Sequence, residues 1–132
     1  MYFEDDGYER VRQLAASDSI ACAHHGRTEV ISALHRKLRE HAISARSYEI
    51  TTKEFLAEIA AGAFRWLPLS ERILERAELV YSNLPATIFL RAADALHLAT
   101  ASENGFREIH SNDTKLLSAA PHFGLRGLNV LG

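Results

Sequence analysis

The stretch RAADALHLATASENGFREIHSND, residues 91–113, decides the fold class. Its first half has the Ala- and Leu-rich composition of a buried helix, and Gly105 is suited to the end of that helix. A short apolar strand, EIHS at 108–111, follows. The stretch also places Asp94 among small and apolar helix residues, and Asp113 directly after the strand. Because burying an uncompensated carboxylate is costly, both acids need an explanation.

Helices and strands alternate along the rest of the chain. Hydrophobic periodicity predicts helices at 8–16, 27–41, 70–83, 88–103 and 113–120, with another that begins at a Thr51/Glu54 capping box. Short apolar runs predict strands at 19–23, 64–69, 108–111 and 128–131. Such alternation is typical of an α/β domain with a mostly parallel sheet. With no repeats or linkers, we expect residues 1–132 to form one domain.

Composition narrows the functional classes. The content of 47% hydrophobic and 24% charged residues is ordinary for a globular domain. The single cysteine, Cys22, cannot form an internal disulfide, which favours a cytoplasmic protein. The sequence shows no signal peptide and no long apolar run, so we expect neither export nor a membrane span. A net charge of −2 means that any nucleic-acid binding must come from a local basic patch.

Three acids lie where ligands bind in parallel α/β sheets, beyond the carboxyl ends of the strands. Asp113 follows the strand at 108–111, and Glu29 lies in the first turn of the helix after the strand at 19–23. Asp94 lies in the helix before Asp113. Converging carboxylates are the usual oxygen ligands of Mg²⁺. We therefore predict that the three acids meet at one rim and hold a metal ion.

Each acid also has a simpler structural interpretation. Asp113 can cap the helix that follows it, and Glu29 can interact favourably with the dipole of its helix. Asp94 can pair with Arg91, three residues earlier. The metal hypothesis is favoured by the combination of the three acids and not by any one of them.

Other polar residues are weaker candidates. Arg27, two residues before Glu29, is a better candidate for a phosphate contact than the basic run 36–46, which we expect to be a solvated helix face. Ser111 either caps a helix or orients a water molecule. No Cys or His pair has a zinc-ligand spacing, so we expect no structural zinc site and expect His97 to be a packed or supporting group.

Three segments together resemble a known family. They are RTEVISALHRKLRE at 27–40, LRAADALHLATASENG at 90–105 and HSNDTKLLSAA at 110–120. Their order and spacing resemble those of the PIN domain family and, within it, the VapC-type toxins of bacterial toxin–antitoxin pairs. The resemblance implies a three-layer sandwich, with a mostly parallel sheet flanked by helices. It also implies an endoribonuclease that uses Mg²⁺ or Mn²⁺ to hydrolyse RNA phosphodiester bonds, forms a homodimer and is silenced by a small antitoxin protein.

By position, the resemblance implies catalytic roles for Glu29, Asp94 and Asp113, with Asp94 and Asp113 as metal ligands and Ser111 as a helper. The family begins with a central strand that ends in another aspartate, and residues 1–6 align just after that element. We therefore expect one of two situations. Either the coding start is placed too late, or the chain is truncated and only binds an antitoxin or a partner protomer.

Overall fold

The computed structural model describes residues 20–129, so the helix predicted at 8–16 lies outside the described part. Its elements are β1 (Ile20–Ala23), α2 (Gly26–Arg39), α3 (Ala45–Ala60), β2 (Phe64–Leu67), α4 (Glu71–Asn83), α5 (Ala92–Glu103), β3 (Glu108–Ser111), α6 (Thr114–Ala119), the 3₁₀-helix η1 (Ala120–Phe123) and β4 (Arg126–Asn129). This order confirms the predicted α/β class.

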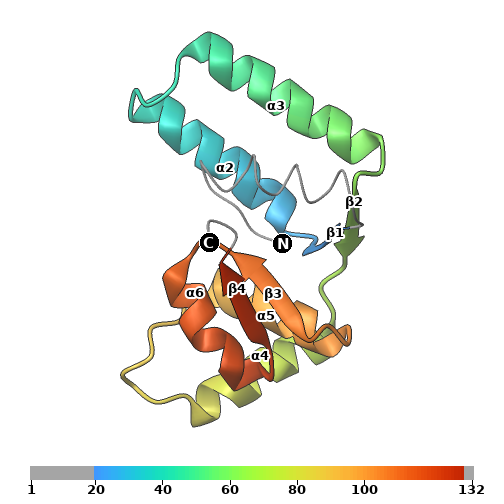
Figure 1. The fold of residues 1–132 in the computed structure, drawn as a ribbon, viewed down its shortest axis with the longest axis vertical. Helices are drawn as coiled ribbons and strands as arrows, with labels where there is room; N and C mark the ends of the chain where they lie inside the picture. Colours follow the sequence, from blue (N-terminus) through green and yellow to red (C-terminus); the bar gives the residue numbers. More distant parts are fainter. Residues whose placement is uncertain (1–19, 130–132) are drawn as a thin grey trace.

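The strands form two parallel pairs. β1 pairs with β2, aligning Cys22 with Trp66, and β3 pairs with β4, aligning His110 with Leu128. The sequence predicted one mostly parallel sheet, and both ladders in the described part of the chain are parallel. Within residues 20–129, however, the pairs are two separate sheets, because no ladder joins β1 or β2 to β3 or β4. Figure 1 shows the α2–α3 hairpin at one end, and α4, α5 and α6 around β3 and β4 at the other.

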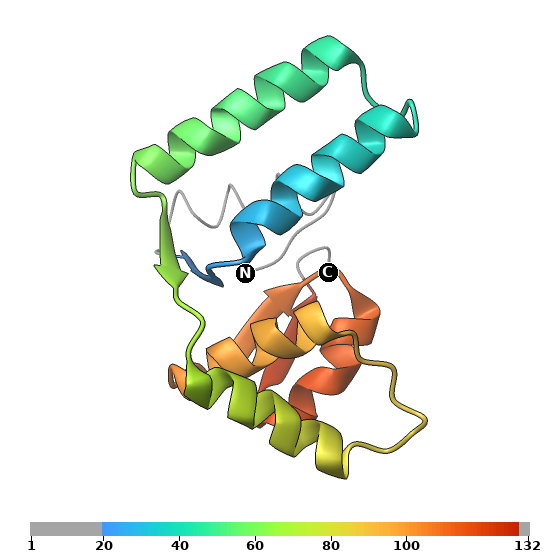
Figure 2. The same ribbon diagram turned by 180° about the vertical axis from the view of Figure 1, so that it is seen from behind.

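Each half has its own hydrophobic core. The smaller core packs α2 and α3 onto the first strand pair, and its buried residues are Cys22, Val30, Phe55 and Phe64. The larger core joins α4, α5, α6 and η1 to β3, and its buried residues are Ile73, Ala77, Val80, Ala95, Leu98, Ala99, Ile109, Leu116, Ala119, Ala120, Phe123 and Leu125. The halves meet where α5 packs against β1 (Figure 2).

The start of α3 differs from the prediction. The helix begins after Ser44, whose hydroxyl oxygen accepts the backbone N–H of Ser47 at 3.0 Å. Thr51 lies well inside α3, so the predicted Thr51/Glu54 capping box is wrong. A capping box requires an N-cap residue with non-helical backbone angles, and Ser44 has them (φ −77°, ψ 160°).

The start of α5 is also later than predicted. The predicted helix covered 88–103, but α5 begins at Ala92 after Arg91, whose backbone is extended (φ −82°, ψ 153°). The hydroxyl group of Tyr81 donates to the carbonyl oxygen of Leu90 at 2.6 Å, so the preceding segment is held against α4. Gly105 has a φ of +80°, which confirms its predicted place after the helix.

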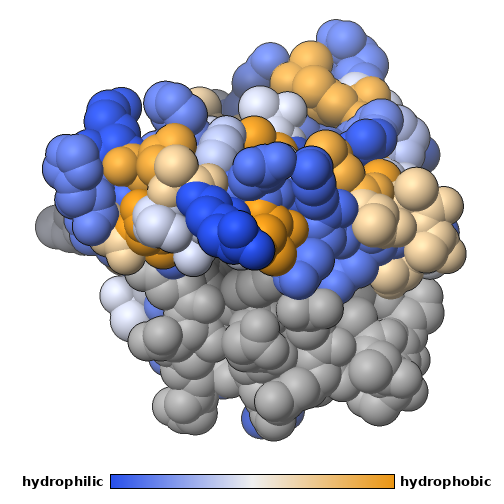
Figure 3. All heavy atoms as spheres, turned by 90° about the horizontal axis from the view of Figure 1, so that it is seen from above, coloured by the Kyte–Doolittle hydropathy of each residue, from blue (hydrophilic) through white to orange (hydrophobic). Residues whose placement is uncertain are grey.

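The helical surface is mixed in polarity. In the view onto the α2–α3 end, hydrophilic and hydrophobic side chains are interspersed (Figure 3). On α3, Ile50 and Leu56 are among the exposed large hydrophobic residues. Within residues 20–129, no helix is both long enough and apolar enough to cross a membrane.

The cap of α3 allows a direct test of its start. We expect Ser44→Ala to lower the free energy of unfolding by about 1 kcal/mol, because it removes the acceptor of the Ser47 N–H. The matched control, Thr51→Ala, should change it by no more than about 0.5 kcal/mol, because alanine is favoured inside a helix. Urea unfolding followed by circular dichroism measures both. A larger loss for Thr51→Ala than for Ser44→Ala would contradict the observed helix start.

Candidate functional site

One arginine joins two of the predicted acids. Arg91 donates from Nε to Asp94 Oδ2 at 3.2 Å and from a terminal nitrogen to Asp113 Oδ2 at 3.4 Å. Asp94 is 2% exposed. Burial raises the pKa of Asp94, and the neighbouring Arg91 cation opposes that rise. The two carboxylates therefore lie around one positive charge.

Asp113 has a structural role as well. It is the N-cap of α6, and its Oδ1 accepts the backbone N–H groups of Lys115 at 2.9 Å and Leu116 at 3.3 Å. Ser111 is completely buried, and its hydroxyl oxygen accepts the backbone N–H of Asp113 at 3.0 Å. Ser111 thus fixes the turn that presents Asp113. The capping role and the contact with Arg91 coexist, because they use different oxygens of Asp113.

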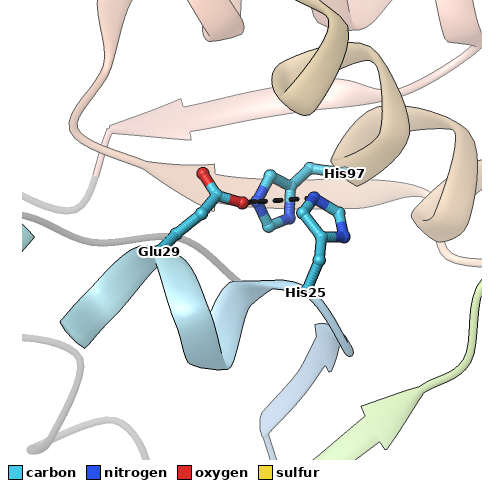
Figure 4. Close-up of side chains that lie close together, drawn as sticks. All are labelled: His25, Glu29 and His97. Atoms are coloured by element: carbon cyan, nitrogen blue, oxygen red, sulfur yellow. Dashed lines mark hydrogen bonds and ion pairs between the residues drawn. The ribbon is translucent and has the colours of Figure 1, made fainter. Parts of the chain in front are cut away.

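Glu29 is bound by two histidines. His97 Nε2 lies 2.5 Å from Glu29 Oε1, and His25 Nε2 lies 3.1 Å from the same oxygen (Figure 4). Burial alone would raise the pKa of Glu29, but hydrogen bonds from His25 and His97 lower that pKa to about 2. Burial lowers the pKa of His97, and the neighbouring Glu29 carboxylate opposes that shift.

These three residues lie at the junction of the two halves. His25 immediately precedes α2 and also lies 3.3 Å from the carbonyl oxygen of Ala93, at the start of α5. Glu29 lies in the first turn of α2, and His97 lies in α5. One ligand atom from each residue lies within 4.8 Å of the others, so the group could hold a metal ion.

A cavity of about 320 Å³ connects Glu29 with Asp94. It is lined by Glu29, Ser32, Ala33, His35, Arg36, Arg39, Arg91, Ala93 and Asp94. The structure therefore brings Glu29 and Asp94 to one cavity, and it brings Asp113 to Asp94 through Arg91. The cavity combines carboxylates with three arginines, an arrangement suited to a cation and a phosphate together.

Arg27, which the sequence favoured for a phosphate contact, does not line this cavity; its arginines are Arg36, Arg39 and Arg91. Arg27 lies over the ring of Trp66, at 5.8 Å from its centroid, and lines a different cavity together with His24 and His25. Arg36 and Arg39, which were expected on a solvated helix face, line the cavity with the acids. Their spacing was a usable signal, because Arg36 follows Glu29 by two helical turns and so shares its face.

The sequence predicted that His97 is a packed or supporting group, and His97 is buried beside Glu29, but the contacts of His25 and His97 with Glu29 were not predicted. His25 and Glu29 are four residues apart, about one helical turn, so their contact could have been predicted from the sequence. His97 is separated from Glu29 by 68 residues, so only the packing of α5 beside α2 brings the two together. A search for zinc-ligand spacings among Cys and His pairs could not find a ligand group that spans two halves of the fold.

The chain belongs to the PIN domain family, since the PIN domain family model matches residues 1–121. PIN domains are typically metal-dependent nucleases and generally use divalent metals. No curated protein matches the chain. The family agrees with the α/β fold and with a cavity lined by acids.

The depressed pKa of Glu29 makes stability depend on pH. Its folded-state pKa is about 2 against an ordinary value of 4.5. As pH falls, the unfolded chain is protonated at Glu29 first, so stability that is present above pH 4.5 is lost toward pH 2. We expect Glu29→Gln to remove on the order of 2–3 kcal/mol of this pH-dependent stability.

Urea unfolding at a series of pH values, with EDTA present, measures this effect. The control is Glu49→Gln on α3, whose carboxylate is 65% exposed and pairs with Lys53 at the surface. It should follow the pH profile of the unmodified chain. If Glu29→Gln also followed that profile, the proposed compensation of Glu29 by the histidines would be wrong.

Proposed function

We propose that this PIN domain is a divalent-metal-dependent endoribonuclease and the toxin of a bacterial toxin–antitoxin pair. The observation that carries the nuclease assignment is the cavity in which Glu29 and Asp94 face Arg36, Arg39 and Arg91. The toxin role, the cytoplasmic location, the homodimer and the small antitoxin partner are supported by the resemblance of the three segments at 27–40, 90–105 and 110–120.

The residues present fit a divalent cation. Asp94 and Asp113 both form ion pairs with Arg91, so their carboxylates already lie close to one positive group. Carboxylate oxygens are hard ligands of the kind that Mg²⁺ and Mn²⁺ prefer. Asp94 and Asp113 would hold the ion, and Glu29 would complete the set directly or through water. When bound, such an ion stabilises charge on the phosphate and makes water a stronger nucleophile.

Glu29 is assigned a charge-stabilising role and not that of a general base. A carboxylate whose pKa is about 2 is a weak base near neutral pH, and His25 and His97 already contact one of its oxygens. It contributes a fixed negative charge at the wall of the cavity. Ser111 acts through Asp113, because its hydroxyl group holds the Asp113 backbone and is itself buried.

The arginines at the cavity suit an RNA phosphate. The net charge of the chain is −2, so binding of a polyanion depends on a local basic group. Arg36 and Arg39 supply one beside Glu29. A guanidinium group can make two parallel hydrogen bonds to a phosphate, which positions the phosphodiester bond as well as binding it. Arg27, predicted from the sequence to contact phosphate, lies beside the neighbouring cavity and would contact a more distant part of the RNA.

One observation favours a second candidate, a non-catalytic module that binds an antitoxin or a partner protomer. Arg91 forms ion pairs with both Asp94 and Asp113, which is also what a purely structural role of these acids would require. In this case the acids and Arg91 would be a charge network that supports the fold, with Asp94 as its buried member.

The two candidates differ in the metal dependence of RNA cleavage. We expect the chain to cleave single-stranded RNA with Mg²⁺ or Mn²⁺, and we expect EDTA to abolish cleavage. Asp94→Asn should lower the rate by roughly 100-fold or more, because it removes a charge that is 2% exposed and faces Arg91. A fluorescent RNA cleavage assay measures the rates.

Glu71→Gln, an exposed change at the start of α4, is the matched control and should keep the unmodified rate. Cleavage that persists both in EDTA and in Asp94→Asn would refute the metal mechanism. No cleavage together with no Mn²⁺ binding at millimolar concentration by calorimetry would favour the non-catalytic module.

The assignment of the phosphate-contacting arginines has its own test. We expect Arg36→Gln and Arg39→Gln each to weaken RNA binding, and to lower the slope of log affinity against log salt by about 0.7 per lost contact. The control is Arg126→Gln on β4, whose side chain is 75% exposed and does not line the cavity. Each change is made in the Asp94→Asn variant, and binding is measured without metal, so that the RNA is not cleaved during the titration. Equal salt slopes for all three variants would contradict the assignment.

A further inference from the structure

We propose that His25, Glu29 and His97 form a site for a transition-metal ion, with Zn²⁺ as the principal candidate. This site adds the imidazoles of His25 and His97 to Glu29, whereas Asp94 and Asp113 offer only carboxylate oxygens, which suit Mg²⁺. It goes beyond the proposed function, because cleavage of RNA with Mg²⁺ requires no imidazole ligand.

The three side chains converge from two elements that are distant in sequence. In Figure 4 the rings of His25 and His97 both turn toward the carboxylate of Glu29. Their Nε2 atoms lie 3.1 Å and 2.5 Å from the same oxygen, and the two ring centroids are 4.2 Å apart. One donor atom per residue thus lies within 4.8 Å of the other two. The donors are already gathered before any ion arrives.

The spacing needs only a small adjustment. An ion with bonds of about 2.1 Å in tetrahedral geometry separates its ligand atoms by about 3.4 Å. The His25 distance of 3.1 Å is close to that value, whereas the His97 distance of 2.5 Å must lengthen by less than about 1 Å. Glu29 can make this shift, because its side chain is 26% exposed and carries a second oxygen.

A histidine binds a metal ion through a ring nitrogen that carries a lone pair in place of a proton. An ion at this site would therefore replace the present contacts of both Nε2 atoms with Glu29 Oε1, and that of His25 Nε2 with the carbonyl oxygen of Ala93.

The donor set selects the class of metal. Two imidazoles with one carboxylate suit Zn²⁺ and its first-row neighbours, whereas Mg²⁺ prefers oxygen ligands. Three protein ligands also leave one tetrahedral position open. Glu29 lines the 320 Å³ cavity together with Asp94, so the site borders the proposed RNA cavity. A second interpretation is a purely structural clip, in which hydrogen bonds alone join α2 to α5.

Metal binding by the untagged chain separates these interpretations. Zn²⁺ is titrated by calorimetry, and Co²⁺ by visible absorption, each in excess Mg²⁺. We expect one Zn²⁺ to bind per chain even in excess Mg²⁺, and we expect the intense absorption of four-coordinate Co²⁺. His25→Gln should weaken Zn²⁺ binding by at least about tenfold. The control His24→Gln removes the adjacent exposed imidazole, which lies outside the group, and should leave Zn²⁺ binding unchanged.

Glu29→Gln is the second variant and keeps the size of the side chain, so it guards against a loss of binding caused by a disturbed fold. It too should lose Zn²⁺ binding while its circular dichroism spectrum stays unchanged. No Zn²⁺ binding by the unmodified chain, or equal losses in His24→Gln and His25→Gln, would overturn the proposal and leave the clip. Because the readout is binding, absence of RNA cleavage would count against the proposed function alone.

Discussion

The carboxylate of Glu29 is the point on which the arrangement of the two halves depends. It lies between His25, just before α2, and His97, in α5, so one ionised group connects the α2–α3 half with the half built on α4, α5 and α6. Each half has its own hydrophobic core. Its contacts with His25 and His97 join the two halves at that junction, where Glu29 and Asp94 from different halves line one cavity.

Local compensation of buried charge is the common theme of the site. Asp94 has Arg91, Asp113 has Arg91 and the first backbone N–H groups of α6, and Glu29 has its two histidines. None of these acids is stabilised by solvent alone, so removal of a partner leaves a costly charge behind. The same partners hold the carboxylates in fixed positions. That preorganisation is what metal binding and phosphate chemistry both require.

Sequence patterns predicted those features that depend on neighbours along the chain. The stretch at 91–113 correctly indicated α5, the Gly105 end, β3 and the acid that follows it, because helical periodicity and turn chemistry are local. The Thr51/Glu54 capping box was wrong because a local match of residue types does not show where the helix begins. A capping motif is defined by residue types alone, whereas a real cap also needs the extended backbone that Ser44 provides.

The sequence by itself thus determined the α/β class, most of the helices and strands, and the acids worth considering. Only the tertiary structure decided which residues share a site. It places Arg36 and Arg39, and not Arg27, at the acid-lined cavity. It also brings His97 into contact with Glu29, although the two are 68 residues apart in the sequence. The physical reason is that these distances are set by the packing of α5 against β1 and beside α2. That packing results from the burial of whole helix faces and leaves no local pattern in the residues that it brings together.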